Sequence, residues 1–276
     1  MATAPTKPTT TPKKESSGTS SLFATLTIPL CIAVAITIFL FILGDPSHFK
    51  GGIVDHGEPT DIYGTVYSGG VLVPLVMSFV LMVIVFSIER FIVISKASGT
   101  GSVDAFVRKI QAALNAGNID AAMAECDKQK GSVANVIKAG LKKYKEVENE
   151  AGDVDQKTLA IQKDIEEATA LEMPMLEQNL TIIATLVSIG TLVGLLGTVI
   201  GMIKAFAELS GAATNTSALS AAISEALVNT AMGITTSALS IVMYNVFTSK
   251  IDGLTYAIDE TGFSIVQTFA ASHKNK

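Results

Sequence analysis

One stretch of the chain, residues 181–203, reads TIIATLVSIGTLVGLLGTVIGMI and contains no charged side chain. About 20 apolar residues in a helix are enough to cross the roughly 30 Å hydrocarbon core of a bilayer. Buried strands of soluble proteins are this apolar over only about 4–8 residues. The stretch therefore predicts a transmembrane helix.

Three further stretches are also free of charge over a similar length, namely residues 22–43, 71–88 and 226–247. Only 16% of the 276 residues are charged, whereas a soluble domain has about 25%. The length of the first run favours a membrane span over a cleaved signal peptide. The sequence thus predicts an all-α, polytopic inner-membrane protein whose long helices extend into a cytoplasmic helical region.

The basic residues are unevenly distributed between the predicted spans. Twelve of the twenty Lys and Arg residues lie in 89–180, whereas 44–70 and 204–225 hold one each. Because loops rich in Lys and Arg stay in the cytoplasm, both chain ends and residues 89–180 are expected there.

The resulting order of segments alternates consistently across the membrane. The predicted segments are a disordered cytoplasmic leader (1–21), an extra transmembrane helix (22–43), a periplasmic loop (44–70), a second transmembrane helix (71–88), the cytoplasmic helical region (89–180), a third transmembrane helix (181–203), a short periplasmic loop (204–225), a fourth transmembrane helix (226–247) and a cytoplasmic C-terminal helix or tail (248–276).

The cytoplasmic region carries helix signals and no strand signals. Ser102 and Asn118 are expected to be helix N-caps, separated by Gly117 as the residue that ends the first helix. Asp153 and Gln156 have the spacing of a capping box. A helical pattern then runs from residue 154 to residue 208, where Pro174 either kinks or breaks the helix.

Small residues follow one face of the third and of the fourth predicted span, at spacings of 4, 3 and 4. On the third span they are Gly190, Gly194, Gly197 and Gly201, with Thr191 and Thr198 on the same face; on the fourth they are Ala226, Thr230, Gly233 and Ser237. Such faces let helices approach closely in lipid. The pattern fits tight packing with hydroxyls bonded to their own backbone, or a face that receives a partner helix.

No predicted span contains a carboxylate, Lys, Arg or His in its core. Proton relays across membranes normally use such groups, so a partner must supply the titrating group if protons pass. Glu225 at the mouth of the fourth span is read as an end-of-helix carboxylate, and Glu89 with Arg90 as an interfacial charge pair at the cytoplasmic membrane boundary.

Several classes of function are disfavoured by composition. A net charge of −5 argues against nucleic-acid binding. Two cysteines and three scattered histidines provide no metal site and no nucleophilic catalytic set. We therefore expect no cofactor and no enzymatic activity.

Three motifs in order resemble the MotA/TolQ/ExbB proton-channel family, and its ExbB branch most. They are Ser87-Ile88-Glu89-Arg90-Phe91; the stretch GLLGTVIGMI at 194–203; and Ile223-Ser224-Glu225-Ala226-Leu227 followed by Thr230-Ala231-Met232-Gly233 and Tyr244-Asn245. The resemblance covers residues 70–250. Typical family members have three spans. With its additional first span, the chain resembles ExbB-like proteins of the Bacteroidota.

The resemblance implies a motor subunit driven by the proton motive force. Family members form a ring, a homopentamer in the ExbB branch, around an ExbD-like single-span partner. An aspartate in the membrane span of this partner carries the protons. The proton flow energises a TonB-like protein for outer-membrane transport. The resemblance also implies that Thr198 and Thr230 face this partner and that Glu225 marks the entrance of the pathway. We expect Thr191 and Ser237, on the same small-residue faces, to line this pathway as well.

The sequence departs from the family at two positions where prolines are common, Thr191 and Leu239. The alternatives are a TolQ-like subunit of the Tol-Pal envelope system and a passive helical membrane scaffold. The ExbB-like motor subunit and both of these alternatives imply a homo-oligomer in a lipid bilayer. The ExbB-like and TolQ-like roles place the chain in the inner membrane of a Gram-negative bacterium.

Overall fold

The computed structural model describes residues 17–52, 54, 59–209 and 216–273. These residues form an elongated all-helical molecule, and within them no strand occurs beyond one isolated bridge between Phe49 and Pro59. Most of the predicted leader, 1–21, lies outside the described residues, which begin with helix α1 at Ser17.

Four helical stretches of the described chain are long and apolar enough to cross a membrane, which confirms a polytopic all-α protein. They are Phe23–Leu43, Gly70–Asn115, Val154–Leu209 and Thr216–His273. Each covers one of the charge-free runs in the sequence, the first of them except for Leu22.

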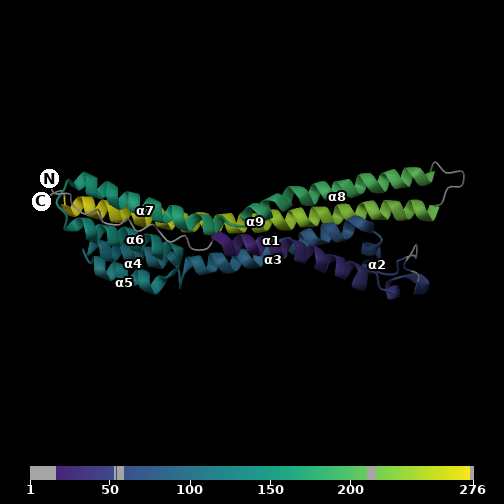
Figure 1. Ribbon diagram of the computed structural model, residues 1–276, viewed down its shortest axis with the longest axis horizontal. Coiled ribbons are helices and arrows are strands. Elements are labelled where there is room, and N and C mark those ends of the chain that lie inside the picture. Colours follow the sequence, from purple (N-terminus) through teal and green to yellow (C-terminus); the bar gives the residue numbers. More distant parts are fainter. Residues whose placement is uncertain (1–16, 53, 55–58, 210–215, 274–276) are drawn as a thin grey trace, which may run out of the picture.

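Two parts of the molecule can be distinguished in Figure 1. At one end, α8 (Leu180–Leu209) and the first half of α9 (Thr216–His273) run side by side in opposite directions. We call this the paired end. At the other, the second half of α9 packs against α4 (Val103–Asn115), α6 (Gly131–Glu148) and α7 (Val154–Glu177), and α5 (Ile119–Gln129) packs on α4 and α6. We call this the bundle end.

Helices α1 (Ser17–Ile38) and α3 (Val73–Ser98) pack against each other in the middle of the molecule, and α3 also contacts α8 and α9. A π-helical turn, Phe39–Leu43, continues α1. Between α1 and α3 the chain forms a small helix, α2 (Ile62–Tyr67), and the 3-10 turns η2 (Pro46–His48), η3 (Lys50–Gly52) and η4 (Gly70–Leu72). The predicted loop 44–70 is therefore partly helical.

The bundle end has a hydrophobic core at the positions where the apolar pattern repeats along each helix. The core side chains include Phe106, Ile110 and Leu114 of α4, Val136, Ile137 and Leu141 of α6, Ile161 of α7, and Ile258, Ile265 and Phe269 of α9, each at most 2% exposed. Helix α9 thus contributes to the core of the bundle and also runs through the paired end.

The predicted N-caps Ser102 and Asn118 are confirmed. The Ser102 hydroxyl accepts a hydrogen bond from Ala105 N, and Asn118 Oδ1 accepts one from Ala121 N at 2.9 Å. Gly117, with φ +68°, ends the first helix as expected. The predicted capping box at Asp153 is wrong, because Asp153 is the N-cap residue but its side chain makes no capping bond.

The helical pattern from residue 154 to residue 208, for which the sequence left open whether Pro174 kinks or breaks the helix, forms two helices. Helix α7 passes through Pro174 and ends at Glu177, and α8 begins at Leu180 after Asn179 in the left-handed region (φ +61°). The continuous long helix is instead α9, whose 58 residues span about 87 Å at 1.5 Å per residue. The predicted loop 204–225 is likewise helical up to Leu209 and from Thr216 onward.

Replacing Ile137 with Ala tests the packing of the bundle. Ile137 is fully buried in α6, so the substitution should destabilise the bundle by about 2–5 kcal/mol, because it leaves a cavity. Hydrogen exchange of α6 amides measures this as a lower free energy of local opening. Lys142→Ala, an exposed position of the same helix, should change it little, and equal effects of the two substitutions would contradict the described packing.

Candidate functional site

The backbones of α8 and α9 meet along the row of glycines of α8. A Cβ on Gly194 would lie 3.0 Å from Gly233 Cα, and one on Gly233 would lie 2.7 Å from Gly194 Cα. A Cβ on Gly190 would meet Ser237 Oγ at 2.9 Å, and one on Gly201 would meet Ala226 Cβ at 2.6 Å. Any larger side chain at these positions would separate the two helices.

This close approach brings two pairs of hydroxyl groups together across the helices. Thr191 Oγ1 and Ser237 Oγ are 2.7 Å apart, and the hydroxyls of Thr198 and Thr230 are also in direct contact. Residues 191 and 198 are seven apart, which is about 10.5 Å along a helix. All four side chains are only partly buried, so the two pairs form a polar row along one edge of the α8–α9 pair.

The hydroxyls of this row also bond to backbone carbonyls within the chain. Thr230 Oγ1 lies 3.1 Å from both Gly194 O and Ala226 O, and Ser237 Oγ lies 3.1 Å from Gly233 O. Each hydroxyl has one proton and two acceptor sites. The row can therefore accept a further hydrogen bond from a neighbouring group, although it holds no titratable side chain of its own.

Glu225 lies apart from the hydroxyl row, near the start of α9. Lys204 Nζ of α8 is 2.6 Å from Glu225 Oε1 and 2.8 Å from Oε2. A Cβ on Gly70 of η4 would lie 2.5 Å from Glu225 Oε1. Glu225 and Thr230 are five positions apart, which is about 140° around the helix, and the Glu225 carboxylate faces Lys204 and η4.

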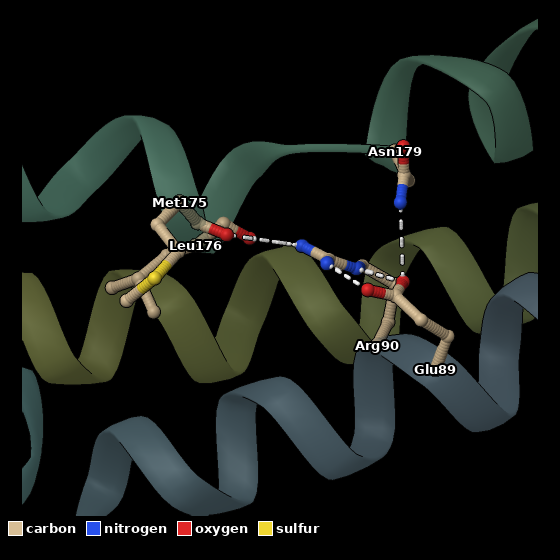
Figure 2. A network of polar contacts seen from close by, with 5 residues as sticks. All are labelled: Glu89, Arg90, Met175, Leu176 and Asn179. Atoms are coloured by element: carbon tan, nitrogen blue, oxygen red, sulfur yellow. Dashed lines mark hydrogen bonds and ion pairs between the residues drawn. The ribbon is translucent and has the colours of Figure 1, made fainter. Parts of the chain in front are cut away.

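Glu89 and Arg90 form an ion pair that belongs to a larger, mostly buried network (Figure 2). Arg90 is 1% exposed, and its guanidinium binds Glu89 through two contacts, one of them Nε to Oε2 at 2.6 Å. Its Nη1 donates to the carbonyls of Met175 and Leu176, both at 3.2 Å. These carbonyls belong to the last turn of α7, where no backbone N–H is available to them.

Asn179 completes the network, because its Nδ2 donates to Glu89 Oε2 at 3.3 Å. Asn179 is the residue with positive φ between α7 and α8, and Glu89 belongs to α3. The network therefore holds the junction between α7 and α8 against α3.

The structure brings together Thr191, Thr198, Thr230 and Ser237, whereas Glu225 and the Glu89–Arg90 network lie at separate places. Reasoning from the sequence missed Lys204 as the partner of Glu225, although the two residues end one charge-free run and begin the next. It also missed Asn229, a fully buried amide among the apolar residues of α9.

Metal binding and catalysis by a cysteine nucleophile have little support in the described part of the chain. No group of three or more His, Cys, Asp or Glu residues there could hold a metal ion. Burial raises the pKa of the Cys126 thiol to about 12, so this cysteine is a neutral thiol near pH 7 rather than a thiolate nucleophile.

Comparison with known proteins identifies one family. Residues 128–260, which include α7, α8 and most of α9, match the model of the MotA/TolQ/ExbB proton channel family.

Two curated relatives are similar to the chain. The "Putative biopolymer transport protein ExbB-like 3" of Synechocystis is 38% identical over 88 residues, which are 31% of this chain and 42% of that protein. The chain thus matches less than half of that relative's length. The "Tol-Pal system protein TolQ" of Pseudomonas aeruginosa is 25% identical over 205 residues, which are 72% of this chain and 86% of TolQ.

Replacing Arg90 with Met should destabilise the chain by about 3–5 kcal/mol, because Glu89 then keeps a partly buried charge without its main partner. The double variant Glu89→Gln/Arg90→Met should lose less, since the unpaired charge is also removed. Unfolding in mixed micelles by SDS titration measures these differences. Arg108→Met, an exposed position in α4, should stay within about 0.5 kcal/mol, and a double variant less stable than Arg90→Met would contradict the network.

Proposed function

We propose that the chain, whose residues 128–260 match the MotA/TolQ/ExbB proton channel family, is an ExbB-like subunit of a motor driven by the proton motive force. Together with an ExbD-like partner, it uses proton flow to energise a TonB-like protein for active transport across the outer membrane. It is a channel and motor subunit rather than an enzyme, and it needs no cofactor.

The observation that carries this proposal is the polar row of α8 and α9. Thr191, Thr198, Thr230 and Ser237 place four hydroxyls within two runs that contain no Asp, Glu, Lys, Arg or His. Hydroxyls can bind and orient a proton carrier but do not ionise near pH 7. A partner helix with a carboxylate in its membrane span supplies the missing group, and the half-buried row offers it hydrogen bonds.

The arrangement of the whole assembly follows from the pairing of the polar row with the carboxylate of a partner helix. Copies of the chain form a ring, a homopentamer in our proposal, with each polar row facing the single-span partner at the centre. The bundle end, which holds most of the Lys and Arg residues, and both chain ends lie in the cytoplasm, and the paired end with Glu225 faces the periplasm of a Gram-negative bacterium. The ring resides in the inner membrane.

A TolQ-like role in the Tol-Pal system is the second candidate. It is supported by the similarity to TolQ of Pseudomonas aeruginosa, which extends over 72% of this chain. The two roles share the proton pathway and differ in the protein that the motor drives. Copurification of a TonB-like or of a TolA-like protein from the native membrane distinguishes them.

A passive helical scaffold is the third candidate. It is supported by the hydrogen bonds that the hydroxyls already make within the chain. A scaffold predicts normal function when Thr198 and Thr230 are both made apolar, whereas a motor predicts a loss.

Replacing Thr230 with Val should lower partner-dependent proton flow into liposomes roughly two- to tenfold. One lost hydroxyl bond costs about 0.5–1.5 kcal/mol, and about 1.4 kcal/mol corresponds to a factor of ten in rate. Thr235→Val is the matched control, because Thr235 lies in the same helix, is exposed and bonds only to Ala231 O of its own helix. Flow equal to wild type in Thr230→Val, with the complex still assembled, would contradict the role of the polar row.

A further inference from the structure

The segment formed by α2 and η4, residues 62–72, is tied to the interior of the α8–α9 pair by one side chain. Asn229 Nδ2 donates to Gly69 O at 2.7 Å and to Glu225 O at 3.0 Å. Asn229 is fully buried, and Gly69 is 160 residues away in the sequence. The bond therefore joins the connection before α3 directly to α9, one turn beyond Glu225.

Three glycines make room for this contact. A Cβ on Gly197 of α8 would lie 2.4 Å from Asn229 Cβ, so only glycine at this position accommodates the amide. A Cβ on Gly69 would meet Val228 at 2.8 Å. Gly70 has φ +77°, a conformation that side chains with a Cβ rarely adopt, and it lies directly against the Glu225 carboxylate.

The Glu225 carboxylate is consequently held between two elements. Lys204 Nζ of α8 contacts both of its oxygens, and the Gly70 backbone lies on another side of it. The Glu225 side chain is 14% exposed, whereas that of Lys204 is 52% exposed. The position of η4, which depends on Asn229, thus helps to determine how open this carboxylate is to solvent.

Packing alone does not account for an asparagine at position 229. Its Oδ1 is buried and has no hydrogen-bond partner among the described residues. A buried acceptor without a partner lowers stability, and replacing it with an apolar group of similar shape is often neutral or favourable. The amide is therefore better explained by what its Nδ2 holds in place.

We propose that Asn229 is a positioning residue for Glu225: by binding the Gly69 carbonyl it holds η4 against the Glu225 carboxylate, and this sets the access of protons to the entrance of the pathway. The proposal rests on the proton-channel function proposed above. It assigns the connection between α1 and α3 a direct role at the channel mouth.

The test compares Asn229→Ala and Asn229→Thr in the full chain, purified with its partner. The threonine hydroxyl can still bond to Glu225 O four residues earlier but cannot reach Gly69, so it isolates the contact with η4. The matched control is Ser240→Ala, a fully buried position of α9 whose hydroxyl bonds only to Thr236 O of the same helix.

The first readout is hydrogen exchange of the backbone amides of α2 and η4, which does not depend on proton flow. We expect about tenfold faster exchange in both Asn229 variants, because local opening becomes easier when a buried hydrogen bond is lost, and no change in Ser240→Ala. Exchange as slow as in wild type would show that Asn229 does not hold this segment and would overturn the proposal.

The second readout is partner-dependent proton flow, measured also with Lys204→Met and with the double variant Lys204→Met/Asn229→Ala. We expect each single substitution to change flow roughly two- to tenfold. The double variant should change it no more than the stronger single substitution, because both act through Glu225. A purely structural defect would instead multiply the two effects, and this outcome, or unchanged flow in the Asn229 variants, would overturn the positioning role.

The two proposals fail in different ways. Absence of partner-dependent flow in the unmodified complex overturns the proposed function and the role of Asn229 with it. Normal flow in the unmodified complex, combined with independent effects of Lys204 and Asn229, overturns the role of Asn229 alone.

Discussion

The backbones of α8 and α9 touch between Gly194 and Gly233, and the arrangement of the paired end depends on this contact. Without a hydrophobic driving force between helices in lipid, close backbone packing is a main source of helix association. The same approach brings Thr198 to Thr230 and Thr191 to Ser237. A side chain larger than glycine along this row would therefore separate the hydroxyl pairs as well as the helices.

Helix α9 and the Arg90 network provide a second constraint, because together they link the paired end to the bundle. Helix α9 runs through both parts as one 58-residue helix, whereas α7 and α8 are separated at Asn179. Arg90 binds the last carbonyls of α7, and Glu89 binds Asn179, so α3 supports the break on both sides. A displacement of the bundle is thus expected to act on the membrane helices through α9 and through this network.

Features that depend on neighbouring residues could be predicted from the sequence, and features that depend on distant residues could not. The four spans follow from charge-free runs, and the caps at Ser102 and Asn118 follow from local hydrogen bonding. The sequence left open whether the helix breaks at Pro174, because the carbonyls that end α7 are bound by Arg90, about 85 residues earlier. Asn229 was overlooked for a similar reason, since its partner Gly69 lies 160 residues away.

The central claim is that the polar row of α8 and α9 lacks a proton carrier that another protein supplies. Purification of the tagged chain from its native membrane in mild detergent, followed by mass spectrometry of the intact complex and of its components, tests this claim most directly. The account predicts a ring of this chain with a small single-span protein that has a carboxylate inside its span. An intact ring with no such protein, from membranes in which the system is active, would contradict it.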